Sequence, residues 1–202
     1  GQKEKDKDWK EMLKSPIFYL MILLLMSGAF SGMMIISQAS AVGMEMIGLS
    51  VAAAGIAVSV LALFNSFGRI LAGFLSDKIG RVQTLTLACF LSVGGNVLLY
   101  LCGKGDLILF YIGISIVGIC FGAFMGVFPG FTADQFGAAH NSVNYGIMFI
   151  GFAMAGYFGP TIMKNVYYKN GFYTQAFLIA AGLSVAGIIL TVLYRMCKKR
   201  EK

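Results

Sequence analysis

Residues 46–103 read MIGLSVAAAGIAVSVLALFNSFGRILAGFLSDKIGRVQTLTLACFLSVGGNVLLYLCG. Two long apolar runs are separated here by a short turn that contains Asp77, Lys78 and Arg81. A helix that crosses a bilayer needs about 20 mostly apolar residues, and both runs reach that length. The stretch therefore predicts two membrane-spanning helices joined by a tight, charged turn.

The same pattern extends over the whole chain of 202 residues, of which 58% are apolar and only 12% charged. A soluble domain carries about 25% charged residues. The chain contains six long runs without Asp, Glu, Lys or Arg: Ser15–Met44, Met46–Gly68, Val82–Gly103, Leu107–Ala133, Gln135–Met163 and Asn170–Tyr194. Strands of a membrane barrel would alternate polar and apolar residues over segments of about ten. The sequence therefore predicts an all-α membrane protein with six transmembrane helices.

The charged residues at the two ends divide the chain into three parts. Residues 1–14 mix Lys with acids and predict a cytoplasmic linker, which ends just before Pro16. Proline is favoured in the first turn of a helix, so Pro16 marks the start of the six-helix domain, residues 15–195. Residues 196–202 form a basic tail. A linker in front of six spans suggests that another segment precedes it.

Orientation follows from Lys and Arg in the short loops, which are enriched on the cytoplasmic side. If the linker is cytoplasmic, that side carries Lys3, Lys5, Lys7, Lys10, Lys14, Lys78, Arg81, Arg195, Lys198, Lys199, Arg200 and Lys202. The opposite side carries only Lys104, Lys164 and Lys169. This asymmetry predicts a multi-pass protein with both termini in the cytoplasm. Arg69 remains unassigned, because it lies within a span.

Several classes of function are excluded by the same counts. No polar segment is long enough for a soluble enzyme domain, and the net charge of +7 is not gathered into a nucleic-acid-binding patch. The four cysteines show no CxxC spacing, so we predict no metal and no cofactor. The apolar runs contain no Asp or Glu, and the only histidine, His140, lies at an edge. A membrane enzyme needs paired acids, a metal trio or a nucleophile with its base, so no enzyme is predicted.

Arg69 is the strongest candidate for a functional residue. A charged side chain inside a span costs about 2.5–3.5 kcal/mol on insertion scales and usually marks a functional cavity. Asn65 and Ser66 lie four and three residues earlier, on the same helical face. A guanidinium offers forked donors that match a carboxylate, which predicts a site for an anionic substrate. The alternative is that Arg69 extends toward the membrane surface near Asp77.

A stripe of glycines follows one face of the fourth span: Gly118, Gly122, Gly126 and Gly130. Small residues at this spacing let a second helix approach closely. We interpret the stripe as a packing surface, with a sliding helix contact as the alternative.

The charged turn carries the most specific motif in the chain. Its residues Gly73, Asp77, Lys78, Gly80 and Arg81 fit the pattern G-x-x-x-D-[RK]-x-G-[RK]. We expect Gly73 to allow close packing, Asp77 to accept hydrogen bonds at a neighbouring helix end, and Gly80 to permit the turn. The two cations would anchor the loop at the inner surface. The motif resembles the signature loop of the major facilitator superfamily, which joins the second and third helices of each six-helix half.

The resemblance extends over nearly the whole chain, toward the carboxyl half of oxalate/formate antiporter-type carriers, which are relatives of monocarboxylate transporters. The similar segments are Trp9–Pro16, Asn65–Arg69, Ser76–Arg81, Phe128–Gly137, Asn144–Gly146 and Gly159–Pro160. The resemblance implies that the spans are helices seven to twelve of a carrier in a bacterial inner (plasma) membrane. Its partners would be the missing N-terminal six-helix half and the lipid bilayer. It also implies that Arg69 binds the substrate carboxylate.

The aromatic residues implied for the pocket are Phe121 and Phe149, while Tyr19 is suggested by composition only; packing against lipid or helices is the alternative for each. By the resemblance, the family's oxalate exchanger carries a lysine near the position of Phe152, so Phe152 is also predicted to bind substrate. Gln135–Met163 contains no Lys or Arg. A monocarboxylate such as lactate, pyruvate or formate therefore fits better than the oxalate dianion.

The resemblance predicts a secondary transporter that works by alternating access, as anion exchange or proton symport. Glu45 and His140 are the weaker candidates for a proton-coupling group. The alternative function is an oligomeric six-helix pore or channel for anions. Channels usually show charged rings or filter loops, and only Arg69 has this character.

Overall fold

The computed structural model describes residues 6–200, so residues 1–5 of the predicted linker and 201–202 of the predicted tail lie outside it. The elements are α1 (Trp9–Lys14), α2 (Pro16–Val42), the π-helix η1 (Gly43–Ile47), α3 (Val51–Ile79), α4 (Arg81–Leu101), α5 (Leu107–Phe136), α6 (Asn141–Met148), α7 (Ile150–Asn170) and α8 (Thr174–Arg200). Six helical stretches are long and apolar enough to cross a membrane: α2 with η1, α3, α4, α5, α6 with α7, and α8. The prediction of six spans is confirmed.

The leader is fixed by local hydrogen bonds. Asp8 caps α1, since its carboxylate accepts from the Glu11 amide at 2.8 Å while the Glu11 side chain accepts from the Asp8 amide. This reciprocal arrangement satisfies two donors that a helix start leaves open. Ser15 is extended, and Pro16 begins α2. The predicted linker 1–14 thus contains a short helix that leads directly into the first span.

The helices extend beyond the charged residues that bound the uncharged runs. The first span continues as η1 to Ile47 and therefore includes Glu45, and α5 includes Asp134 in its last turn. α8 continues to Arg200, so residues 196–200 of the predicted basic tail are helical. Charges near helix ends reach the polar boundary of a membrane, which explains why the helices need not end at them.

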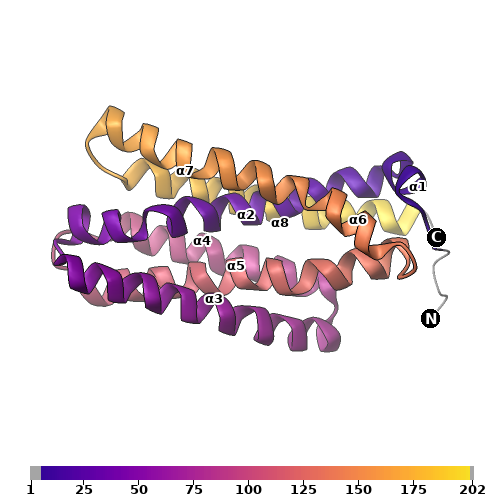
Figure 1. The fold of residues 1–202 in the computed structure, drawn as a ribbon, viewed down its shortest axis with the longest axis horizontal. Helices are drawn as coiled ribbons and strands as arrows, with labels where there is room; N and C mark the ends of the chain where they lie inside the picture. Colours follow the sequence, from indigo (N-terminus) through magenta and orange to yellow (C-terminus); the bar gives the residue numbers. More distant parts are fainter. Residues whose placement is uncertain (1–5, 201–202) are drawn as a thin grey trace.

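The helices form a series of neighbours, in which α3 packs on α5, α5 on α4, α4 on α8, α8 on α2 and α2 on α7. In Figure 1, α7 follows the upper edge of the bundle and α3 the lower edge, with α2 and α5 between them. In the most apolar window of each span, 56% of residues are buried in α2 and α5 but only 22% in α3. α3 therefore presents much of its surface outward.

The glycine stripe of α5 is the packing surface for α3. A Cβ at Gly118 would lie 2.9 Å from the Leu61 carbonyl oxygen, and one at Gly126 would lie 2.5 Å from the Arg69 carbonyl oxygen. A Cβ at Gly122 would overlap the Asn65 carbonyl oxygen. The predicted close approach of a second backbone is confirmed. Its partner is the part of α3 that carries Asn65 and Arg69.

A buried polar network ties together the helices on the other side of the bundle. The Ser92 hydroxyl of α4 lies 3.1 Å from that of Ser31 in α2 and 2.9 Å from that of Ser184 in α8. Asn96 donates to Ser31 at 2.9 Å. Hydrogen bonds between membrane helices contribute about 0.6 kcal/mol on average, so this network chiefly fixes the register of α2, α4 and α8.

Candidate anion-binding site

Arg69 lies on the exposed part of α3, one turn after Asn65. Its Nε donates to Asn65 Oδ1 at 3.3 Å, and its side chain is otherwise without an ion pair or hydrogen-bond acceptor among residues 6–200. It precedes the helix end at Ile79 by ten residues, or about 15 Å along the axis. Asp77, nearer that end of the helix, pairs with Arg81 at 2.7 Å. The guanidinium keeps donors available for an anion.

Ser66 shares the exposed face but is engaged differently. Its hydroxyl donates back to the Ala62 carbonyl oxygen at 3.1 Å, as serines in membrane helices often do. The structure therefore joins Arg69 to Asn65 and leaves Ser66 bonded within its own helix.

The three predicted phenylalanines form one continuous aromatic row. Phe149 stacks on Phe152 with ring centroids 4.4 Å apart, and Phe152 lies 6.1 Å from Phe121 of α5. Tyr145 extends the row from Phe149 at 5.6 Å. Phe121 is next to Gly122, which packs against the backbone of Asn65 and Arg69. The row thus connects α5, α6 and α7, and its Phe121 end lies beside the turn of α3 that carries Arg69.

Local structure explains how the row is held. Phe149 occupies the short interruption between α6 and α7, and Phe121 is 5% exposed because its ring lies against Gly32 of α2. Transporters commonly build substrate sites at interrupted helices near the membrane midplane. These rings can therefore pack between the helices and also form a wall of the site.

Two other candidates lie at the ends of the bundle. Tyr19 is near the start of α2 and donates to the Leu13 carbonyl oxygen of the leader at 3.0 Å. Glu45 lies in η1 at the opposite end, near Tyr167 and Tyr173. Burial, with the nearby carboxylate, raises the pKa of Tyr173 to about 12. Neither candidate belongs to the cluster around Arg69.

The charged turn between α3 and α4 joins three helix ends. Arg81 pairs with Asp77 at 2.7 Å and with Asp134 of α5 at 3.0 Å. Gly80 is the only residue between the two helices and has φ 96°, a conformation that favours glycine. The Arg81 guanidinium also lies against Gly130, where an added Cβ would be 3.2 Å from it. The last glycine of the stripe thus makes room for this ion-paired cation.

One expectation for the turn is not met. A Cβ at Gly73 would meet no atom of the described residues within 4 Å, so the close packing predicted for Gly73 is not found within this bundle. Arg81 makes two ion pairs in addition to its predicted place at the end of the bundle. Lys78 lies over the Phe74 ring, with its Nζ 4.3 Å from the centroid.

Comparison with known protein families shows to which family this bundle belongs. The family model described as Major Facilitator Superfamily matches residues 1–160 and, in a second overlapping match, residues 39–202. The chain belongs to the major facilitator superfamily. Its six helices are one half of the fold of that superfamily, as the sequence predicted.

Two curated relatives support the assignment. An uncharacterised MFS-type transporter of Escherichia coli (strain K12), YhjX, is 30% identical over 154 residues, covering 76% of this chain and 38% of the relative. The oxalate:formate antiporter of Oxalobacter formigenes is 31% identical over 159 residues, covering 77% of this chain and 37% of the relative. The match thus spans less than half the length of each relative. Membership of this superfamily, together with the six apolar helices, indicates a multi-pass membrane protein from a family of transporters.

Sequence reasoning missed two residues of these arrangements. Tyr145, Phe149 and Phe152 recur at the spacing i, i+4, i+7, which places side chains on one helical face, and this signal would have added Tyr145 to the row. Asp134 lies between the uncharged runs Leu107–Ala133 and Gln135–Met163 and therefore falls outside the spans predicted from the sequence. Its pairing with Arg81 joins residues 53 positions apart, and no local pattern predicts such a contact.

Proposed function

We propose that this chain is the carboxyl-terminal half of a secondary transporter for small carboxylates of the lactate, pyruvate, formate or oxalate class. The observation that carries the proposal is Arg69, an exposed guanidinium within a span whose only hydrogen-bond partner among residues 6–200 is Asn65. The similarity to an oxalate:formate antiporter supports the same class of substrate. The other partners in the proposal are an amino-terminal six-helix half and the bilayer of an inner membrane, with both termini cytoplasmic.

The chemistry of binding follows from the guanidinium. Its planar donors match the two oxygens of a carboxylate, and such charge-assisted bonds are roughly twice as strong as neutral ones. Asn65 holds the Nε side of the group, which leaves the terminal amino groups for the substrate. The backbone under Arg69 is supported by the glycine stripe, so the donor is presented from a firmly packed helix.

The surroundings favour a monoanion. Phe149 and Phe152 place stacked rings where a second cation would be needed for a dianion. The span Asn141–Asn170 carries its charged residues, Lys164 and Lys169, only toward its far end. One guanidinium neutralises one carboxylate, so lactate, pyruvate and formate suit this half better than oxalate.

Alternating access requires the two halves of such a carrier to rock around a site between them. The outward-facing surface of α3 and the open space at Gly73 suit a face that meets the other half. The Arg81 ion pairs would then hold the ends of α3, α4 and α5 together as one body. Anion exchange and proton symport are both compatible with this arrangement.

The test of the proposal is uptake by the complete carrier in proteoliposomes, measured with labelled lactate, formate and oxalate. We expect saturable uptake of at least one of them, accelerated when the same unlabelled anion is inside. Uptake indistinguishable from protein-free vesicles for all three would refute the proposal. Non-saturable flux without acceleration by internal anion would favour the oligomeric anion pore. Uptake driven by a pH gradient alone would indicate symport.

Phe152→Lys is expected to shift selectivity toward the dianion. A second cation beside the aromatic row would neutralise the second carboxylate of oxalate, and charge-assisted bonds contribute about 1.5–3 kcal/mol each. Competition between labelled oxalate and formate should therefore move at least tenfold toward oxalate. The matched control is Phe158→Lys, on an exposed position of the same helix. Equal shifts in both variants would contradict a role for position 152.

Asp134→Asn is expected to slow transport roughly two- to fivefold without changing the half-saturation concentration, because an exposed ion pair contributes about 0.2–1 kcal/mol. Asp134 links the turn to α5 and lies eight residues beyond Gly126, which packs against the Arg69 backbone, so only the conformational step should respond. Initial rates over a range of substrate concentrations measure both quantities. Asp106→Asn, in the loop before α5, is the control. If the half-saturation concentration changed as well, the ion pair would affect substrate binding and not only the conformational step.

A further inference from the structure

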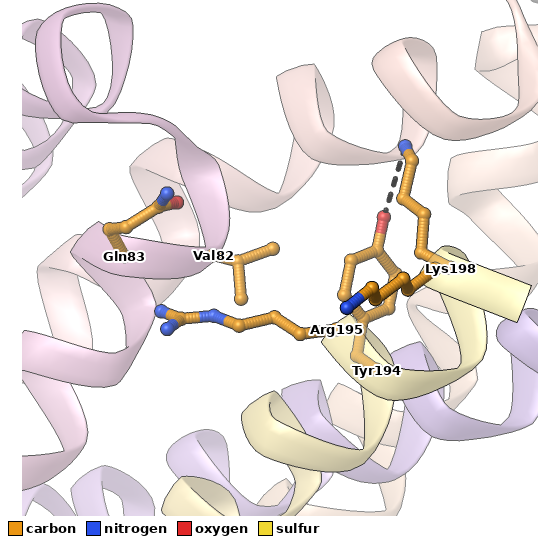
Figure 2. A pocket seen from close by; sticks show the side chains of 6 residues that line it. Val82, Gln83, Tyr194, Arg195 and Lys198 are labelled. Atoms are coloured by element: carbon orange, nitrogen blue, oxygen red, sulfur yellow. Dashed lines mark hydrogen bonds between the residues drawn. The ribbon is translucent and has the colours of Figure 1, made fainter. Parts of the chain in front are cut away.

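A groove opens between α4 and α8 at the end of the bundle that also carries α1 (Figure 1). Its volume is about 360 Å³, and its lining residues are Val82, Gln83, Tyr194, Arg195, Lys198 and Lys199. Figure 2 shows Arg195 extended from α8 across the groove toward α4. This groove plays no part in the site around Arg69.

The groove is strongly basic and preorganised. Among the described residues that line it, three are cations and none is an acid. The Arg195 guanidinium donates to Thr86 Oγ1 of α4 at 3.1 Å, and Lys198 donates to the Gln135 side chain at 2.9 Å. The neutral Thr86 hydroxyl holds the Arg195 guanidinium in place without cancelling its charge. The nearby carboxylate of Asp134 is bound to Arg81.

The surface beyond the groove is apolar. Phe90 lies one turn beyond Thr86 on α4 and is 58% exposed, and Val192 lies one turn beyond Arg195 on α8 and is 48% exposed. Both residues lie toward the middle of their spans. A basic end and an apolar continuation on the same two helices match a molecule with an anionic head and hydrocarbon chains.

The position of the groove keeps it open to the bilayer. α4 and α8 pack on each other and on α5 and α2, on the side of the bundle away from the edges formed by α3 and α7. Basic pockets between membrane helices at this level commonly bind lipid head groups. We propose that the groove binds the phosphodiester of an anionic phospholipid, held by Arg195 and Lys199, with its acyl chains along Phe90 and Val192.

The test measures lipid binding by the complete protein in a neutral detergent, titrated with phosphatidylglycerol and, separately, phosphatidylcholine. The variant is Arg195→Gln with Lys199→Gln. The matched control is Lys164→Gln with Lys169→Gln, which removes the same charge from the opposite end of the bundle. We expect preferential binding of phosphatidylglycerol, weakened roughly 30-fold in the groove variant and unchanged in the control.

Three outcomes would overturn the proposal. Equal loss of binding in both double variants would mean that the lipid is attracted by the general positive charge of the protein. Equal binding of the two lipids would mean that the groove does not distinguish headgroups by their charge. Soluble glycerophosphate or inorganic phosphate binding as tightly as the lipid would assign the groove to a free phosphate. If the double variant does not fold, Lys199→Gln alone keeps the Arg195–Thr86 bond, and we expect it to bind roughly fivefold more weakly. The readout involves no transport, so it is independent of the carboxylate proposal.

Discussion

Arg69→Ala is expected to reduce carboxylate uptake by the complete carrier at least roughly 100-fold at low substrate concentration. The substitution removes the forked donor that the proposed substrate requires. Hydrogen bonds to a charged group contribute about 1.5–3 kcal/mol each, and two of them lost together correspond to 100-fold or more in affinity. Initial uptake rates of labelled lactate, formate and oxalate measure the effect.

The controls separate loss of binding from loss of structure. Arg69→Lys keeps the charge but loses the planar fork, so we expect partial activity with a raised half-saturation concentration. Lys164→Ala removes a cation from the far end of α7 and should transport like the parent. Arg69 is exposed and makes only one side-chain hydrogen bond among the described residues, so Arg69→Ala should fold normally. Native uptake of all three anions by Arg69→Ala would disprove the assignment of Arg69 to the carboxylate.

The course of the six spans could be predicted because hydrophobicity and charge act locally. A run such as Leu107–Ala133 has to be helical in a bilayer, since a helix satisfies its own backbone hydrogen bonds. Two local features remained hidden from this reasoning. The π-helix at Gly43–Ile47 and the interruption at Phe149 occur inside runs whose hydropathy does not change there.

The pairing of helices could be predicted only in part. The spacing of Gly118, Gly122 and Gly126 predicts that a backbone lies against α5, but nothing in that spacing identifies α3 as the partner. Likewise, Phe121 and Phe152 meet only because α5 and α7 both contact α2. Individual candidates such as Arg69 were therefore visible in the sequence, whereas the cluster they form depends on contacts between distant segments.

The contact between α3 and α5 also relates stability to the candidate site. Gly122 lies against the Asn65 carbonyl oxygen. A Cβ added at Gly122 would also lie 3.0 Å from the Arg69 amide nitrogen. The neighbouring atoms belong to backbone, which cannot rotate out of the way as a side chain can. Any added carbon at this position has to move α3 itself, together with the two residues proposed to bind substrate.

Gly122→Ala is therefore expected to destabilise the protein and to impair uptake together. Overpacking in a well-packed interior costs about 2 kcal/mol, which corresponds to a decrease in melting temperature of roughly 5 °C for a protein of this size. The buried thiols of Cys89 and Cys120 become reactive on unfolding. A thiol-reactive dye during heating therefore reports the transition, with Cys197 replaced by serine to remove the more exposed thiol.

Gly94→Ala and Gly182→Ala make the same chemical change where it should be harmless. A Cβ at either position would meet no atom of the described residues within 4 Å, and alanine is a better helix former than glycine by about 1 kcal/mol. These variants should melt at or above the parent temperature and retain uptake. If Gly122→Ala behaved like them, α5 would not lie against the Arg69 turn as described. If it melted early yet retained native uptake, the position of α3 would not control the anion site.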